Sequence, residues 1–368
     1  MTAAIFKPVF DAVGAENEVE NVRSYILVEA ATGTVLEEEN AGEQLNAGYL
    51  SKLMTLLLVA EDIETGKYQL STELTASTTV TGTKGAVVWL EAGDKMTVDE
   101  LLKSVIIGNA NDAVTVLAER SEQTIEKFVM RMNSEAFDLG LRNTAFYSPY
   151  GYYDEREYTT AADMAVICSR LVRFEFLRPY FQTWRDIVRS GQTEVVNENT
   201  FARTLDEHIG LKACHSEEAG YCIAEAALNE SGICCIAVVL GVSDEDTMFR
   251  EAKALVKKGF REYKMTATMF PDEMLMPVKV RRGREAAVEI RLRDQKRLVV
   301  PKGIDELNTV VVIPEYLEAP LKKGQRIGTA AFYSDKNLVC EIDIVAKDSV
   351  EELTFGYVVK KMLLNILK

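Results

Sequence analysis

The stretch NAGYLSKLMTLLLVA, residues 46–60, decides the architecture that we expect for this chain. From Leu53 to Ala60 almost every residue is apolar, so a helix over residues 50–64 would carry apolar side chains around its whole circumference. Such a helix is stable in water only when other elements cover it on every side. We therefore predict a helix that runs through the core and ends at Gly66, because glycine commonly terminates helices.

The flanking segments predict the elements that cover this helix. A strand, a turn at residues 31–33 and a second strand are expected first, and a hairpin with its turn at residues 229–232 follows much later. Thr97 and Glu100 form the pattern of a capping box, and Thr160 is a typical helix N-cap. These signals predict strands at 24–28, 34–36, 220–227 and 233–241, and helices at 97–107, 112–119, 124–139, from 160 onward, and at 246–263.

The pattern of residues divides the chain into four parts. Residues 1–20 are expected to be a loosely ordered leader, and residues 21–263 a mixed α/β domain. After Lys264, short β-like runs alternate with Pro and Gly turns, which predicts a small all-β domain over residues 264–347. Within the last part, 348–368, the run from Val350 to Lys368 mixes apolar residues with lysines. It predicts an amphipathic helix that either docks on protein or lies in a membrane interface.

The composition excludes several classes of function. The 368 residues include 42 Lys and Arg against 57 Asp and Glu, a net charge of −15, which argues against nucleic acid as a partner. Only two His are present, His208 and His215, so a His-rich metal site is impossible and a Ser-His-Asp triad would need one of them. The six Cys form no C-x-x-C pair. We therefore predict neither a metal site nor a cofactor.

The sequence also bears on where the protein acts. It contains no apolar run of about 20 residues, the length that a membrane-spanning helix needs. The opening residues, MTAAIFKPVFDAVGA, hold no apolar run of signal-peptide length. Taken alone, the residues predict a cytoplasmic protein.

Residues 46–55 resemble the opening of the active-site helix in the serine D-alanyl-D-alanine carboxypeptidases, the low-molecular-mass penicillin-binding proteins. In that family Pro-Ala-Ser-x-x-Lys precedes an apolar helix, and Ser-x-Asn and Lys-Thr-Gly motifs follow. The resemblance extends over residues 22–346. Four further segments carry it in the family's order: LEAGDK at 90–95, SPYG at 148–151, AGYC at 219–222 and APLKKGQ at 319–325.

The resemblance implies an α/β fold, namely a penicillin-binding transpeptidase or beta-lactamase-like domain with an antiparallel sheet covered by helices. A β-rich domain and a C-terminal amphipathic helix, which in relatives often lies on the membrane, are implied to follow. The implied activity releases D-Ala from the peptidoglycan stem peptide through an acyl-enzyme, which beta-lactams also trap. The resemblance implies an extracytoplasmic, membrane-associated protein, in contrast to the cytoplasmic protein that the residues alone predict.

The first motif departs from the family's pattern at its nucleophile. Counting back three residues from Lys52 leads to Tyr49, where the family has its Ser. Ser51 is no substitute, because neighbouring side chains on a helix point about 100° apart and do not face each other. In the family a Lys one turn after the Ser lies on the same face and acts as its base. Tyr49 at this position predicts a filled pocket.

The second and third motifs are altered as well. The second reads Asn109-Ala110-Asn111, so Asn109 stands where the family has Ser, and Asn111 is retained. The third reads Lys212-Ala213-Cys214, which keeps the Lys that attracts the substrate carboxylate in the family. Ala213 and Cys214 replace Thr and Gly on the strand whose backbone contributes to the oxyanion hole. The resemblance therefore implies that Lys212, Ala213 and Cys214 are the substrate-binding positions.

Three hypotheses about function follow. The favoured one is a catalytically impaired homologue that binds stem peptide or a partner through Lys52, Asn111 and Lys212. The lysines are expected either to pair with nearby carboxylates or Asn111, or still to bind an anion. The second hypothesis is an active serine carboxypeptidase. The third is a thiol hydrolase using Cys214, although the adjacent His215 would point to the opposite face of a strand.

Overall fold

The computed structural model describes residues 22–268, 276–294, 297–304, 307–334 and 337–366. Within these ranges the chain forms two compact units, one ending at Tyr263 and the other starting at Lys264. Each unit is described by itself. The expected leader at residues 1–20 lies outside the described residues.

An antiparallel sheet is the centre of the first unit. Its strands follow the order β2-β1-β10-β9-β7, and β8 also pairs with β9. The bounds are Ser24–Glu29 (β1), Val35–Glu39 (β2), His208–Gly210 (β7), Ala213–Ser216 (β8), Gly220–Leu228 (β9) and Cys234–Val242 (β10). The predicted strands at both ends of this unit are confirmed, and β8 is the strand that the family resemblance implied for residues 212–215. The strand β7 was not predicted, because it is short and carries no clear alternation of apolar and polar residues.

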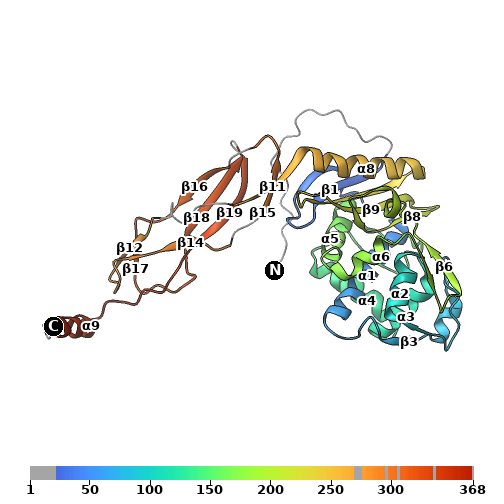
Figure 1. Ribbon diagram of the computed structural model, residues 1–368, viewed down its shortest axis with the longest axis horizontal. Helices are drawn as coiled ribbons and strands as arrows, with labels where there is room; N and C mark the ends of the chain where they lie inside the picture. The colour runs from blue at the N-terminus through green and yellow to red at the C-terminus, as the bar shows by residue number, and fades with distance from the viewer. Residues whose placement is uncertain (1–21, 269–275, 295–296, 305–306, 335–336, 367–368) are drawn as a thin grey trace. The chain divides into compact units, whose positions relative to one another are not determined.

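Helices cover both faces of this sheet, which explains why β9 and β10 are buried along most of their length. Figure 1 shows α8 along one face and α5 with α1 along the other. The main helices are Lys52–Glu64 (α1), Val98–Ile106 (α2), Asn111–Glu122 (α3), Ile125–Asp138 (α4), Ala161–Leu171 (α5) and Glu245–Glu262 (α8). Shorter elements are the helices Arg178–Phe181 (α6) and Phe201–Thr204 (α7), and the 3₁₀ turns Gly48–Ser51 (η1), Thr78–Gly82 (η2) and Glu175–Leu177 (η3).

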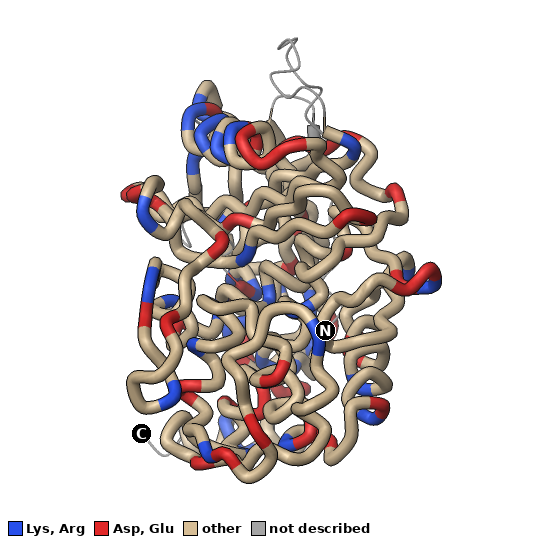
Figure 2. The backbone as a smooth tube through the Cα atoms, turned by 90° about the vertical axis from the view of Figure 1, so that its right-hand side faces the viewer, with Lys and Arg blue, Asp and Glu red and all other residues tan. Residues whose placement is uncertain are grey.

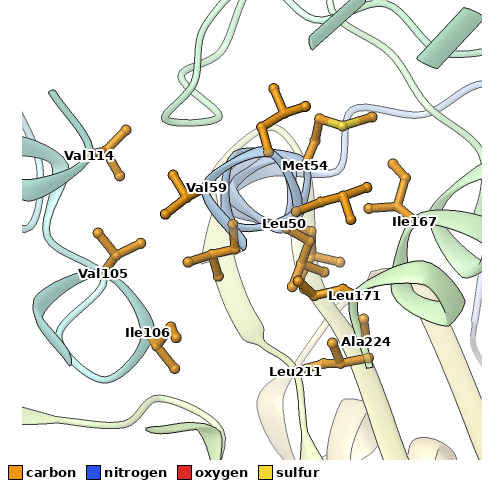
Figure 3. Packing of buried hydrophobic residues seen from close by; sticks show 14 of the residues in the cluster. Leu50, Met54, Val59, Val105, Ile106, Val114, Ile167, Leu171, Leu211 and Ala224 are labelled. Atoms are coloured by element: carbon orange, nitrogen blue, oxygen red, sulfur yellow. The ribbon is translucent and has the colours of Figure 1, made fainter. Parts of the chain in front are cut away.

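The predicted core helix is confirmed. Every residue of α1 from Lys52 to Ala60 is buried, and apolar side chains from α2, α3, α5 and β9 surround it (Figure 3). The α-helix starts at Lys52 rather than at Leu50, because the tighter turn η1 precedes it. Gly48 allows this turn with a φ of 53°, and its amide N–H donates to Asn46 Oδ1 at 2.9 Å.

Local capping chemistry sets the starts of two other helices as predicted. The Thr97 hydroxyl and the Glu100 carboxylate form a complete capping box at the start of α2, and Thr160 accepts from Asp163 N–H at the start of α5. Two small antiparallel strand pairs were not predicted. They are formed by Glu73–Thr75 (β3) with Lys95–Thr97 (β4), and by Arg185–Val188 (β5) with Thr193–Val196 (β6).

The second unit is the predicted all-β domain. Its sheets have the orders β14-β19-β18-β16, β13-β12-β17 and β11-β15, and β11 begins at the unit boundary. The strands are Tyr263–Ala267 (β11), Val278–Arg281 (β12), Ala287–Val288 (β13), Ile290–Leu292 (β14), Arg297–Pro301 (β15), Asn308–Val312 (β16), Tyr316–Glu318 (β17), Arg326–Ser334 (β18) and Asn337–Ala346 (β19). Alternating residues such as Val278 and Val280 point into a separate apolar core.

A C-terminal helix, Phe355–Ile366 (α9), is present as predicted. Its side chains at Phe355, Met362, Leu363 and Leu364 are exposed, and Lys360 and Lys361 lie among them. None of the helices in the described ranges is both long enough and apolar enough to cross a bilayer. Figure 2 shows Lys and Arg interspersed with Asp and Glu along the chain, so no single segment carries the net negative charge.

Candidate functional site

Tyr49 lies in the turn η1, directly before α1, and faces Lys52. The spacing of three residues puts both side chains on one side of the turn, and Lys52 Nζ is 4.7 Å from the centroid of the Tyr49 ring. Burial, followed by the charges of Cys214, Glu198 and Glu218, raises the pKa of the Tyr49 phenol. The ring therefore covers the amine, and its hydroxyl stays protonated at neutral pH.

Lys52 is fully buried and is held by one residue. Its Nζ donates to the backbone oxygen of Asn109 at 2.8 Å and to Asn109 Oδ1 at 2.7 Å. Asn109 presents both oxygens from a left-handed conformation with a φ of 56°, and its Nδ2 donates to Glu198 Oε2 at 3.2 Å. Burial, and then the charge of Lys212, holds the pKa of Lys52 well below its usual value.

Asn111 does not contact Lys52, contrary to one of the pairings expected above. It is the first residue of α3, and its Nδ2 donates to the backbone oxygen of Lys84 at 2.7 Å and to the Tyr152 hydroxyl at 3.4 Å. Its Oδ1 is buried and has no hydrogen-bond partner. The Asn111 side chain therefore presents a buried acceptor that nothing in the described part of the chain satisfies.

Lys212 is also directed into the protein. Its Nζ donates to the backbone oxygens of Val105 and Ile106, at 3.1 and 3.0 Å, in the last turn of α2. Burial lowers the pKa of Lys212, while the charge of Glu198 opposes that shift. The expected pairing of this lysine with a carboxylate is therefore replaced by two carbonyl contacts, which suit a cation at a helix C-terminus.

Cys214 and His215 lie on opposite faces of β8. Cys214 is buried, its Sγ is 3.7 Å from the backbone oxygen of Ala47, and burial raises its thiol pKa well above the usual value. His215 is exposed, and its ring centroid is 4.2 Å from that of Tyr221. The thiol therefore has no imidazole beside it, and the arrangement that a thiol hydrolase needs is not assembled.

Ser51 serves the local structure. Its hydroxyl donates to Glu157 Oε1 at 2.8 Å, and Glu157 Oε2 accepts from the backbone N–H groups of Tyr147 and Ser148 at 2.9 and 3.1 Å. The loop after Ser148 then packs onto η1 so closely that a Cβ at Gly151 would overlap the Gly48 carbonyl oxygen. This loop therefore packs directly against the turn that carries Tyr49.

The structure thus brings Tyr49, Lys52 and Asn109 into contact and places Asn111, Lys212 and Cys214 around them without direct contacts to Lys52. Sequence reasoning missed Glu198, whose charge opposes the lowering of the pKa of Lys52 and Lys212. It also missed Tyr152, whose hydroxyl accepts a hydrogen bond from Asn111. Neither belongs to a motif, so no sequence signal marked them. Among the described residues, no group of three His, Cys, Asp or Glu could hold a metal ion.

Comparison with known proteins gives matches along both units. Residues 12–244 match the family described as D-alanyl-D-alanine carboxypeptidase, and residues 263–352 match the C-terminal domain of penicillin-binding protein 5. The carboxypeptidase DacF of Bacillus subtilis (strain 168) is 29% identical over 346 residues, covering 93% of this chain and 89% of that protein. The carboxypeptidase DacC of Escherichia coli (strain K12) is 29% identical over 361 residues, covering 95% and 89%.

The fold agrees with these matches. The crystal structure of penicillin-binding protein 5 from Haemophilus influenzae superposes with a TM-score of 0.84 at 24% identity, covering 92% of this chain and all (100%) of that one. The family match spans well over half of the chain, and the two predicted domain types are both present. The chain therefore belongs to the D-alanyl-D-alanine carboxypeptidase family of cell-wall metabolism, with the α/β domain and the C-terminal all-β domain of that family.

Proposed function

We propose that this chain is a catalytically impaired member of its family that binds the peptidoglycan stem peptide, or a partner protein, without cleaving a peptide bond. The observation that carries the proposal is the contact between the Tyr49 ring and Lys52 Nζ at 4.7 Å. Acyl transfer needs a hydroxyl within hydrogen-bond reach of its base. Here an aromatic ring occupies that space, and both hydrogen bonds of the amine go to Asn109.

Three features support retained binding. Asn111 Oδ1 is a buried acceptor without a partner, and a peptide N–H would satisfy it. Lys212 uses two carbonyl contacts, so an ammonium form would keep a third N–H for a ligand carboxylate. The third is the charge of Glu198, which opposes the lowering of the pKa of both buried lysines and so favours their charged forms.

The alternative is an active serine-type carboxypeptidase that removes the terminal D-Ala, which is the activity named for the relatives DacF and DacC. It would need a nucleophile other than Ser51, whose hydroxyl is bound to Glu157. We also propose an extracytoplasmic location with peripheral membrane contact through the run from Val350 to Lys368. The exposed apolar side chains of α9 beside Lys360 and Lys361 support that contact.

A fluorescent penicillin tests the catalytic half of the proposal. The wild-type protein is expected to show no covalent band, because Lys52 Nζ donates to Asn109 and not to a serine hydroxyl at position 49. The variant Tyr49→Ser removes the ring and places a hydroxyl one turn before Lys52, so it is expected to become slowly labelled. Tyr49→Phe is the matched control and should stay unlabelled. A labelled wild type whose label persists in Tyr49→Phe would show that another residue is the nucleophile, and would contradict the proposal.

Calorimetric titration tests the binding half. The tripeptide diacetyl-L-Lys-D-Ala-D-Ala is expected to bind the wild type. Lys212→Met is expected to weaken binding at least about tenfold, because it removes the amine N–H that the contacts to Val105 and Ile106 leave for the terminal carboxylate. The same tripeptide ending in L-Ala-L-Ala serves as a control for stereochemistry. Equal affinity for both tripeptides, or no loss in Lys212→Met, would contradict the assignment of the stem peptide as ligand.

A further inference from the structure

A cavity lies at the far end of the sheet from Tyr49. It has a volume of about 500 Å³. The strand β9 connects the two regions, because its residue Cys222 pairs with Cys214 near the candidate site while its last residue, Leu228, lines the cavity. The rest of the wall comes from the loop after β1, the start of β10, β7, and the segment that leads from α5 into α6.

The wall of this cavity is mainly apolar. Side chains of Leu171, Phe174, Phe181, Ile209 and Leu228 line it. Gly210 allows the close approach of β7 to α6, since a Cβ there would lie 3.0 Å from the Phe181 side chain. Volumes between about 300 and 1,000 Å³ with such walls are typical of small-molecule sites. The cavity is thus large enough for a compact organic molecule.

One charged side chain in this cavity lacks a partner. Arg178, the first residue of α6, lines the cavity, and its Nε is buried without a hydrogen-bond partner. Its charge acts on Cys234, another wall residue. Burial raises the pKa of that thiol to about 12, and the charge of Arg178 opposes the shift. A buried N–H without an acceptor costs free energy in the absence of a ligand.

We propose that this cavity is a binding site for a small carboxylic acid with an apolar body, whose carboxylate pairs with Arg178. A guanidinium offers Nε–H and a terminal N–H side by side, which matches the two oxygens of a carboxylate. The apolar body would lie against Phe174, Phe181 and Leu228. Glu175 and Arg173 also line the cavity, but both are exposed, so water screens their opposite charges. The proposal does not depend on the function of the Tyr49 site.

Titration of the full chain with octanoate tests this inference, with octyltrimethylammonium as the probe of equal length and opposite charge. Octanoate is expected to bind with a dissociation constant below about 1 mM, and the cationic probe is not. Arg178→Met is expected to weaken octanoate binding at least about tenfold. Arg185→Met is the matched control, because Arg185 is exposed in β5, pairs with Glu194 and does not line the cavity.

Thermal unfolding separates a binding role of Arg178 from a structural one. Because its Nε has no partner to lose, Arg178→Met is expected to unfold without ligand at the wild-type temperature or above it. A second variant, Ala31→Trp, adds bulk at an exposed wall position and is expected to fold normally while weakening octanoate binding. Unchanged octanoate affinity in both variants would overturn the inference, as would a wild type that does not bind octanoate. A lower unfolding temperature of Arg178→Met without ligand would assign Arg178 a structural role instead.

Discussion

The variant His208→Ala is expected to lower the free energy of unfolding of the first unit by about 3–5 kcal/mol, because it leaves a buried carboxylate without its partner. His208 Nδ1 lies 2.7 Å from Glu225 Oε1, and both side chains are almost inaccessible to water. The other imidazole nitrogen is 3.2 Å from the backbone oxygen of Phe181. Asn199 Nδ2 still donates to Glu225 Oε2 at 2.9 Å, but one neutral amide does not balance a buried charge.

Urea denaturation at pH 7 measures this loss. His215→Ala is the matched control, since His215 is exposed and its removal should change stability by less than about 0.5 kcal/mol. The double variant His208→Ala/Glu225→Gln should be more stable than His208→Ala, because the orphaned charge is gone. A double variant that is less stable than His208→Ala would contradict the explanation.

The same pair predicts a dependence of stability on pH. Burial disfavours the imidazolium, but the hydrogen bond and charge of Glu225 outweigh it and raise the pKa of His208 above its usual 6.5. Burial raises the pKa of Glu225, although the hydrogen bond and the charge of His208 lower it in part. The folded protein therefore binds protons more tightly than the unfolded chain. The extra stability that the pair gives the wild type over the double variant should be fully present below about pH 6.5. It should be lost as the pH rises through the raised pKa of His208.

The variant Gly151→Ala is expected to destabilise the first unit by about 2–5 kcal/mol and to displace Tyr49. Gly151 has a φ of 79°, which costs an L-residue about 1–2 kcal/mol, and an added Cβ would overlap the Gly48 carbonyl oxygen and lie 2.8 Å from Tyr49 Cα. Overpacking of this kind adds about 1–3 kcal/mol. The atoms in the way are backbone atoms of η1, so they cannot turn aside as a side chain would.

Gly140→Ala separates the two contributions to this loss. Gly140 has a φ of 82° but nothing within 4 Å of its Cβ position, so the variant should show the conformational cost alone. Urea denaturation of both variants gives the difference. If Gly151→Ala and Gly140→Ala lose the same stability, the close packing of the 148–151 loop on η1 is not what makes Gly151 necessary.

Local patterns predicted the parts of the fold that depend on nearby residues. The apolar circumference of α1 and the capping box at Thr97 are complete within a few residues of sequence, so both were predicted correctly. The antiparallel pairs β3–β4 and β5–β6 were missed, because their strands are only three or four residues long. The family resemblance implied an antiparallel sheet, but the order of its strands was not predicted, since pairing between distant segments leaves no local pattern.

The candidate site was predictable in its residues but not in its contacts. The motif positions identified Tyr49, Lys52 and Asn111, yet Lys52 binds Asn109 instead of Asn111. That choice depends on the left-handed conformation of Asn109, which turns its backbone and side-chain oxygens to the same amine. Glu198 approaches from the loop after β6, and only the folded chain reveals that approach.

The pairing of β1 with β10 has a consequence for synthesis on the ribosome. Ser24 in β1 pairs with Leu240 in β10, and the apolar helix α1 is covered by α5 and β9, which also follow much later. At about 5–20 residues per second, the roughly 200 intervening residues take on the order of 10–40 s to be made. The helices α2, α3 and α5 are made earlier in that interval, whereas β9, which also lies against α1, is made near its end. Part of the apolar surface of α1 therefore stays uncovered until the late strands of the sheet have been made.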